Sequence, residues 1–439
     1  DAGTDAGMQV DAGSDAGMEM DAGTDAGTQT DAGTMTVDEG GACTTSNECM
    51  AGLRCELSGD TKKCAQLHLA VTRTVATSPT TTTLEAVVIR YKATTAPTKL
   101  SESLTNQNWY PRWNKDGTAV AFVEQVPVDG PTLVSRSIPL TAGTTTLATN
   151  AAAGGTEEFS HLEWAPSSNI AWTKKVGAST SGIFYVAGTG GAVQTATTAG
   201  GFPSWAADGN SFAFSLSTLG LKNKAIGGAE TSVAGAPTTA EQPLHNEANG
   251  VVLYLDPENR SALEISGLST PLMTLFTLNP TAATPAPVKV ADVSEDAIPG
   301  GTLKSYIANP TWAPGGTHVA YVRTYYVQPT SGDPAVLCSG GTNCGGKQGN
   351  ITYVQRVDAT GAPVGSAFQF ATEATLPSFS PDGHFIAYLS GGKLRVQQID
   401  PAATEEVAFK VGVPITHTWT SSTLPSNRAD DHRPRWQPR

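Results

Sequence analysis

The chain has 439 residues, 39% of them hydrophobic, and a formal net charge of −13 at pH 7. Ten of its 40 carboxylates lie in residues 1–40, which contain no Lys or Arg, so the remainder carries 30 acidic against 27 basic side chains. A polyanionic segment beside a nearly neutral remainder argues against nucleic acid as a partner. No run of about eighteen apolar residues is present, so the sequence predicts no membrane-spanning helix.

Residues 1–40 form a low-complexity tail in which Asp-Ala-Gly units repeat every ten residues. Such a composition cannot bury enough apolar surface to offset chain entropy, which predicts a solvated spacer. The alternative is a docking arm, because a fixed spacing lets equivalent residues meet equivalent sites on another copy of the chain. The predicted contacts of that arm are the regularly spaced aspartates Asp1, Asp5, Asp11, Asp15, Asp21, Asp25 and Asp31. The sequence leaves both interpretations open.

The tail also carries a prediction about location. Tandem Asp-Ala-Gly linkers resemble those of cell-surface lipoproteins in some social and predatory bacteria, which implies an exported protein that is either extracellular or at the outer cell surface. No basic and apolar leader precedes Asp1, so we expect that a signal segment has been removed.

Residues 41–66 contain four cysteines, Cys43, Cys49, Cys55 and Cys64. Their spacing lacks the paired C-x-x-C of a zinc site, so no metal is predicted. An even count in an exported chain favours two disulfides, for which three connectivities exist. The segment resembles small EGF-like modules, and this resemblance implies the crossed pairing of Cys43 with Cys55 and of Cys49 with Cys64.

Degraded copies of one segment, Pro377–Ser390, recur from residue 110 onward. Each copy combines an X-Pro step, an aromatic residue, a turn such as Pro-Asp-Gly and an alternating apolar stretch typical of a strand. The X-Pro step predicts extended backbone before the aromatic residue, and the Asp is predicted to serve the turn rather than catalysis. The aromatic anchors are Trp113, Trp164, Trp205, Trp312, Phe379 and Trp436.

These copies resemble the repeat of TolB-like and WD40-like β-propellers, which implies an all-β propeller over residues 67–439. The gap between Trp205 and Trp312 is twice the usual step, and a copy without Trp, Leu244–Tyr254, is expected to fill it. The count then predicts seven four-stranded blades, with six as the alternative. Since Trp436 has no room for three following strands, the C-terminal strand is expected to complete the N-terminal blade, which removes exposed sheet edges.

The remaining motifs do not predict a catalytic or ligand-binding site. Cys338 and Cys344 are predicted to form a third disulfide across a loop. The segment Gly341–Lys347 matches G-x-x-x-x-G-K, but Gln348 replaces the required Ser or Thr and a strand pattern follows, so no phosphate site is expected. His318 and His384, at equivalent places after two turns, are predicted to be exposed, and Asp430–Arg433 to form a solvated rim.

No catalytic motif, cofactor or metal site is found, so the sequence predicts a protein that is not an enzyme. The first functional hypothesis is an exported structural or interaction protein, with the propeller as scaffold and the tail as a linker to a surface or to other copies, as in a filament. The alternative is a surface-anchored receptor for a peptide or glycan of the cell envelope, and an enzyme in the central channel ranks last. Long inserts at Ser294–Asn309, Gln328–Asn350 and Val413–Asp431 are the expected binding face.

Overall fold

The computed structural model describes residues 37–439 except 59, 77–81, 94–95, 104–105, 127–129, 141–142, 150–158, 176–180, 218, 259, 266–267 and 421–431. The chain divides into two units, Asp1–Met35 and Thr36–Arg439. Residues 1–36 of the predicted tail, which include all of its predicted aspartate contacts, lie outside the described residues. Within the described part of the chain, no helix has the length and hydropathy needed to cross a membrane.

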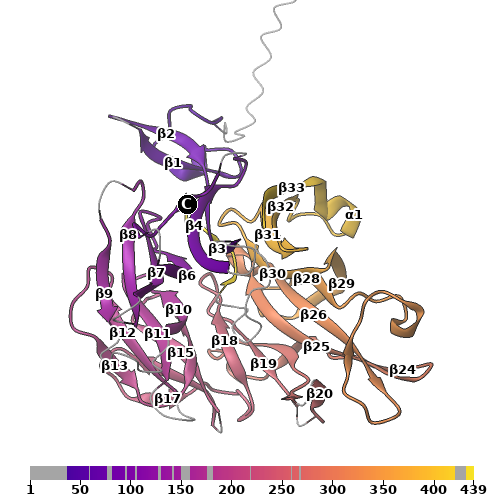
Figure 1. Ribbon diagram of the computed structural model, residues 1–439. Helices are drawn as coiled ribbons and strands as arrows, with labels where there is room; N and C mark the ends of the chain where they lie inside the picture. Colours follow the sequence, from indigo (N-terminus) through magenta and orange to yellow (C-terminus); the bar gives the residue numbers. More distant parts are fainter. Residues whose placement is uncertain are drawn as a thin grey trace, which may run out of the picture. The chain divides into compact units, whose positions relative to one another are not determined.

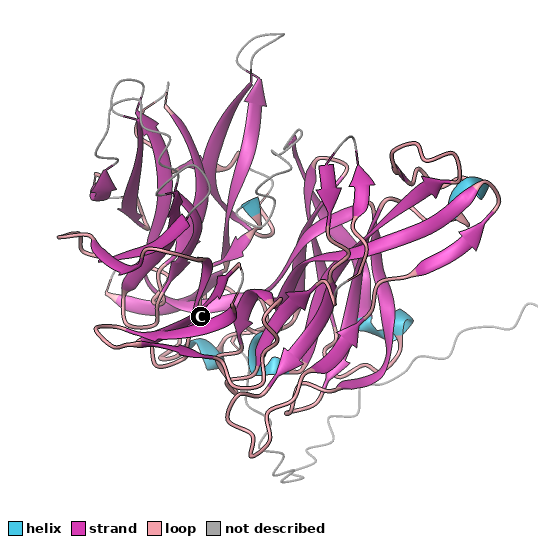
Figure 2. Ribbon diagram, turned by 90° about the horizontal axis from the view of Figure 1, so that it is seen from below, coloured by secondary structure: helices cyan, strands magenta, loops and turns pink. Residues whose placement is uncertain are grey.

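The second unit is a β-propeller of seven four-stranded blades, each an antiparallel sheet (Figures 1 and 2). Blade 1 consists of β34 (Arg435–Trp436), β3 (His68–Ala76), β4 (Thr82–Arg90) and β5 (Thr98–Lys99). Blade 2 consists of β6 (Gln107–Trp113), β7 (Ala119–Val126), β8 (Gly130–Ser137) and β9 (Thr145–Thr149), and blade 3 of β10 (Phe159–Trp164), β11 (Asn169–Lys175), β12 (Ser181–Ala187) and β13 (Gln194–Thr197). Blade 4 consists of β14 (Gly201–Trp205), β15 (Ser211–Leu216), β16 (Gly220–Ala225) and β17 (Glu230–Ser232).

Blade 5 consists of β18 (Glu241–His245), β19 (Val252–Asp256), β22 (Thr274–Leu278) and β23 (Val288–Ala291). Blade 6 consists of β25 (Gly301–Trp312), β26 (His318–Pro329), β28 (Asn350–Val357) and β29 (Pro363–Thr372). Blade 7 consists of β30 (Ala374–Phe379), β31 (Phe385–Ser390), β32 (Lys393–Ile399) and β33 (Lys410–Thr420). Additional strands extend blades 5 and 6: the hairpin β20 (Leu263–Ile265) and β21 (Leu268–Thr270), β24 (Glu295–Ile298) and β27 (Val336–Leu337). The short helices are η1 (Ser46–Glu48), η2 (Pro314–Gly316), η3 (Thr342–Cys344) and α1 (Glu406–Phe409).

Both predictions about the ring are confirmed. The copy that lacks Trp, Leu244–Tyr254, covers the end of β18 and most of β19, so the blades number seven rather than six. The C-terminal strand β34 pairs with β3 of the first blade, with Trp436 opposite Leu69 and Arg435 opposite Ala70. Each neighbouring pair of blades shares a cluster of buried apolar side chains, so the hydrophobic core is distributed around the ring.

The aromatic anchors join one blade to the next by hydrogen bonds as well as by packing. The indole N–H of Trp205 donates to the carbonyl of Glu163 at 3.1 Å, and that of Trp436 to the carbonyl of Ser378 at 3.0 Å. Trp113 and Trp312 make the equivalent bonds to the preceding blade. In blade 5 the anchor position holds His245, whose Nδ1–H donates to the carbonyl of Ser204 at 2.9 Å. An imidazole thus replaces an indole, a substitution that sequence analysis did not detect.

The prediction of extended backbone before the anchors is wrong. Six inner-strand residues have a positive φ of 50–58°, and five of them precede a proline; they are Tyr110, His161, Phe202, Gln242, Asn309 and Leu376. The strand register shifts at each of these places, which marks a β-bulge. A hydroxyl of the preceding blade accepts the amide of the bulged residue in several cases, for example Tyr110 N–H to Thr72 Oγ1 at 3.1 Å. Contacts between blades therefore override the local preference.

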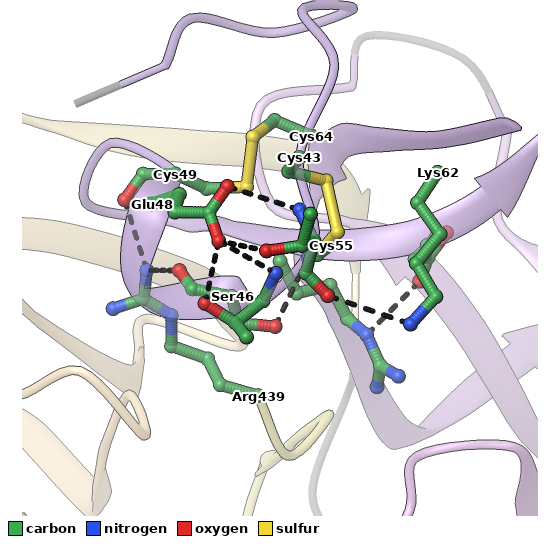
Figure 3. The surroundings of a disulfide bond; sticks show 12 residues. Cys43, Ser46, Glu48, Cys49, Cys55, Lys62, Cys64 and Arg439 are labelled. Carbon is green, nitrogen blue, oxygen red and sulfur yellow. Dashed lines mark hydrogen bonds and ion pairs between the residues drawn. A yellow bond between two sulfur atoms is a disulfide. The ribbon is translucent and has the colours of Figure 1, made fainter. Parts of the chain in front are cut away.

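The cysteine-rich segment folds as a small module around β1 (Leu53–Ser58) and β2 (Thr61–Gln66). Its disulfides join Cys43 to Cys55 and Cys49 to Cys64, which confirms the crossed pairing (Figure 3). Among the described residues, the sulfurs of Cys43, Cys49 and Cys64 are the one group close enough together to hold a metal ion. All three are already bonded in disulfides.

The predicted disulfide between Cys338 and Cys344 is absent from the structure. Both thiols are free and buried, their side chains share a hydrogen bond, and burial is the main cause that raises the pKa of Cys338 to about 12. They pack as small apolar groups against Leu303 and Ile351. Backbone bonds already close the loop, since Cys338 N–H donates to Tyr325 O at 3.0 Å and a β-bridge joins residues 339 and 348.

Candidate ligand site in the central channel

The inner strands converge on a pocket of about 190 Å³ in the channel of the ring. It is lined by residues of blades 1 to 6: Arg112, His161, Leu162, Glu163, Phe202, Pro203, Ser204, Gln242, Pro243, Leu244, His245, Pro310, Thr311, Trp312, Arg433 and Arg435. A pocket to which several rigid strands each contribute one or two side chains has the form of a small-molecule site.

The repeat explains which residues face the channel. Successive side chains of a strand point to opposite faces. Because the anchor packs between blades, the residue just before it turns toward the channel, as do Arg112 before Trp113 and Glu163 before Trp164. The other lining residues at this position are Ser204, Leu244, Thr311 and Arg435. The signal was therefore present in the sequence, one residue before each anchor, but only the anchors themselves were predicted; of those, Trp312 lines the pocket.

Backbone carbonyls hold the buried guanidinium groups in position. Arg112, only 4% exposed, donates from Nε to Leu162 O at 2.7 Å and from Nη1 to Pro111 O at 3.0 Å. Arg433, also 4% exposed, donates from Nη1 to Pro310 O at 2.8 Å. These bonds link blades 2 and 3 and blades 1 and 6 across the channel, and they fix the planes of both groups.

The expectation of a solvated rim at Asp430–Arg433 is wrong for its two described residues. Arg433 lies in the channel, and His432 is 1% exposed, with its ring 4.8 Å from that of Tyr110. The reason is that residues 432 and 433 directly precede β34, whose pairing with β3 brings Arg433 to the channel. Asp430 and Asp431 lie outside the described residues.

Charge in the pocket is predominantly positive. Among the described lining residues, three guanidinium groups face one carboxylate, Glu163. Burial raises the pKa of Glu163, while Arg435, Arg112 and Arg433 act against that rise. Burial lowers the pKa of His245, and the carbonyl of Ser204 partly opposes this, so the imidazole favours its neutral form. His161 packs against Phe202 with the ring centroids 3.9 Å apart.

The predicted histidine pair behaves unequally. His318 is 2% exposed, so the prediction that it is exposed is wrong; its ring lies 5.6 Å from that of Phe409, and burial lowers its pKa to about 4. His384, at the equivalent place in blade 7, is half-buried. The outer connection of blade 7 carries Phe409 over His318, a contact between blades that the sequence of either repeat does not contain.

Two of the predicted inserts, Ser294–Asn309 and Gln328–Asn350, belong to blade 6, and they pack with the hairpin β20–β21 of blade 5, which was not predicted. Ala335 N–H donates to Glu264 O at 2.8 Å, and Tyr306 stacks on Tyr326 at 5.9 Å. Exposed apolar side chains lie on this extension, namely Leu268, Val336 and Leu337. The third insert, Val413–Asp431, is described only to residue 420, as part of β33.

No protein-family model and no curated protein matches this sequence. Solved structures match in fold. TolB from Acinetobacter baumannii aligns with a TM-score of 0.43 and 12% sequence identity, over 85% of this chain and 67% of its own. The periplasmic gluconolactonase PpgL of Pseudomonas aeruginosa aligns with a TM-score of 0.49 and 12% identity, over 81% of this chain and 97% of its own. A putative 6-phosphogluconolactonase from Bacteroides uniformis aligns with a TM-score of 0.46 and 10% identity, over 81% of this chain and 98% of its own.

The described sheets define the class of this protein as a seven-bladed β-propeller. The resemblance of its repeats to those of TolB-like propellers is therefore confirmed at the level of the fold. The disulfides indicate an exported protein. The prediction that the chain is not an enzyme is corrected, because structures of this fold include a gluconolactonase and prolyl endopeptidases, so the fold does not exclude catalysis.

Proposed function

We propose that this chain is an exported binding protein, in which the propeller is the rigid scaffold and the ligand enters the central channel. The observation that carries this proposal is the channel pocket itself, about 190 Å³ in volume and lined from six of the seven blades. A pocket shared by that many blades has a defined shape only when the ring is closed, so binding and ring closure are coupled. Ligand pockets of proteins are concave and present a few polar groups that converge on the ligand.

The composition of the pocket supports a polar organic ligand. Phe202 and Trp312 supply aromatic surface, and Gln242 supplies an amide that both donates and accepts hydrogen bonds. Peptides and glycans of the cell envelope present such polar groups, so the receptor hypothesis is the form of the proposal that we favour. The outer cell surface is the proposed location, and the tail is the proposed link to that surface or to another copy of the chain.

A channel-filling variant tests the proposal. The full chain, Thr311→Trp and Thr231→Trp are screened by calorimetry against envelope glycans, short peptides and small metabolites. Thr311 lines the pocket, whereas Thr231 lies exposed in the outer strand β17. We expect a ligand that binds the full chain and Thr231→Trp but not Thr311→Trp, because an indole occupies much of the pocket. Equal binding to all three proteins would move the site to the outer surface. Analysis of the same mixtures for products would detect turnover.

A further inference from the structure

We infer that the ligand of the channel is an anion bound through a carboxylate group; this inference rests on the proposed function and names the chemical class of its ligand. Three of the charged lining groups, Arg112, Arg433 and Arg435, are cations, and Glu163 is the one carboxylate among the described lining residues. These four groups come from positions 112 to 435 of the chain, and ring closure brings them to one pocket. The resulting excess of positive charge is a property of the folded ring.

The guanidinium groups are held in position before a ligand arrives. Arg112 donates to two carbonyls, at 2.7 Å and 3.0 Å, and Arg433 donates to one at 2.8 Å. A guanidinium plane fixed in this way loses little side-chain entropy on binding, and its fork of N–H donors matches the two oxygens of a carboxylate. Charge interactions are also stronger here than at the surface, because Arg112 and Arg433 are buried in a medium of lower dielectric constant than water.

Size restricts the anion. A pocket of about 190 Å³ has room for a small organic acid or for the end of a peptide but not for a folded polyanion. The carboxylate can thus come from a sugar acid or from a peptide C-terminus, and the experiment separates these two sources.

The test pairs each carboxylate with a neutral counterpart. Glucuronate is compared with glucose, and N-acetyl-dialanine with its amide, by isothermal titration calorimetry on the full chain at low salt. We expect at least one carboxylate to bind at least tenfold more tightly than its neutral counterpart, and binding to weaken as ionic strength rises. Preference for glucuronate assigns a sugar acid, and preference for the acetylated dipeptide assigns a peptide C-terminus.

Three variants distinguish charge recognition from structural damage. Arg435→Gln should weaken binding of the carboxylate about tenfold to a hundredfold, and Arg435→Lys should restore part of it. Glu163→Gln should strengthen binding about twofold to tenfold, because it removes the opposing carboxylate; loss of structure cannot produce an increase. Arg90→Gln, the same substitution at an exposed position of blade 1, is the matched control and should leave the affinity unchanged.

Two results would overturn the inference. The first is that neutral counterparts bind as tightly as the carboxylates. The second is that Arg435→Gln, with an unchanged unfolding temperature, binds as the original chain does. If a neutral ligand binds and Thr311→Trp abolishes its binding, the proposed function stands while the inference about charge fails. If no compound of the wider screen binds in the channel, the proposed function fails as well.

Discussion

Blade 1 and blade 6 are completed by different means. Blade 6 is built from continuous chain, and its two innermost strands, β25 and β26, each contain 12 residues that pair along most of their length. Blade 1 is closed by β34, which has 2 residues and comes from the far end of the chain. Backbone pairing suffices at blade 6, whereas at blade 1 it contributes little, so other contacts must hold the ring closed there.

Side chains and the cysteine-rich module provide these contacts. Trp436 packs on Tyr91 and Phe385, and Gln437 Nε2 donates to Gly117 O at 2.7 Å. Arg54 of the module donates a hydrogen bond from Nη1 to Pro438 O at 2.6 Å. In the reverse direction, Arg439 donates from Nη2 to Cys49 O of the module at 3.0 Å (Figure 3). The comparison indicates that a separately cross-linked module supports closure of the ring. Three predictions test this support and two concern other parts of the chain; they run from the largest expected effect on stability to the smallest.

Trp436→Ala should cost about 3–5 kcal/mol of the free energy of unfolding, because it removes a buried indole and its bond to Ser378 O. Trp312→Ala is the corresponding variant in blade 6, where the half-buried indole makes the equivalent bond to Leu244 O. Its loss should be smaller because the indole is less buried and because β25 stays in register through its long backbone pairing. Urea denaturation measures both, and equal losses would show that the closing blade is no weaker than the others.

Removal of the Cys49–Cys64 disulfide by a double alanine variant should cost about 3 kcal/mol, since it frees a loop with a sequence separation of 15. The pair Cys338→Ala and Cys344→Ala should cost only about 1 kcal/mol, as expected for small buried side chains. Intact mass gives an independent check: reduction of two disulfides adds four hydrogens. A gain of six would mean that Cys338 and Cys344 are bonded after all.

Asp382→Ala should destabilise the protein by about 1–3 kcal/mol and loosen the module, because Gly52 N–H would lose the carboxylate that accepts its bond at 2.6 Å. Asp208, at the same turn position in blade 4, accepts from Asn210 N–H at 2.9 Å and contacts no module. Asp208→Ala should therefore cost less than about 1 kcal/mol. Limited proteolysis of residues 37–66 reports the loosening, which only Asp382→Ala should increase.

Stability should fall as the pH decreases from about 6.5 to about 4, in part through His318. Its pKa is lowered to about 4 by burial, so in this range the unfolded chain binds a proton that the folded chain does not. His318→Gln should flatten this part of the stability curve, and His384→Gln, at the half-buried equivalent position, should change it less. Thermal unfolding at a series of pH values between about 4 and 6.5 measures this dependence. If stability changes with pH equally in the two variants, the assignment to His318 is contradicted.

A version lacking residues 1–36 should unfold with the same free energy as the full chain, because Asp1–Met35 forms a separate unit. Its assembly is the informative readout. If the tail is a docking arm, size-exclusion chromatography and negative-stain imaging should show oligomers or filaments of the full chain that the shortened version does not form. Equal assembly of the two, or a full chain that stays monomeric at high concentration, supports the spacer.

Much of the fold could be read from local pattern. The turn residues and alternating strands of each repeat depend on neighbours in sequence, so the copies around Trp113 and Phe379 could be recognised as blades. The final copy at Trp436 implied closure because too little chain followed it. The crossed cysteine pairing followed from a resemblance. The candidate site was not predicted. Three of its charged residues, Arg112, Glu163 and Arg435, share the position just before an anchor, but nothing in the local pattern places that position in the channel.

By itself, the sequence determined the number of blades, the place of the anchors and the need for the two ends of the chain to meet, since each depends on a repeated local pattern. Only the tertiary structure decided the bulges at Tyr110 and its equivalents, the burial of His318 and the meeting of Arg112 with Arg433 and Arg435 in one channel. The physical reason is that these features depend on contacts between blades: a hydroxyl, an aromatic ring or a carbonyl from elsewhere in the chain sets the conformation, burial and charge of each residue.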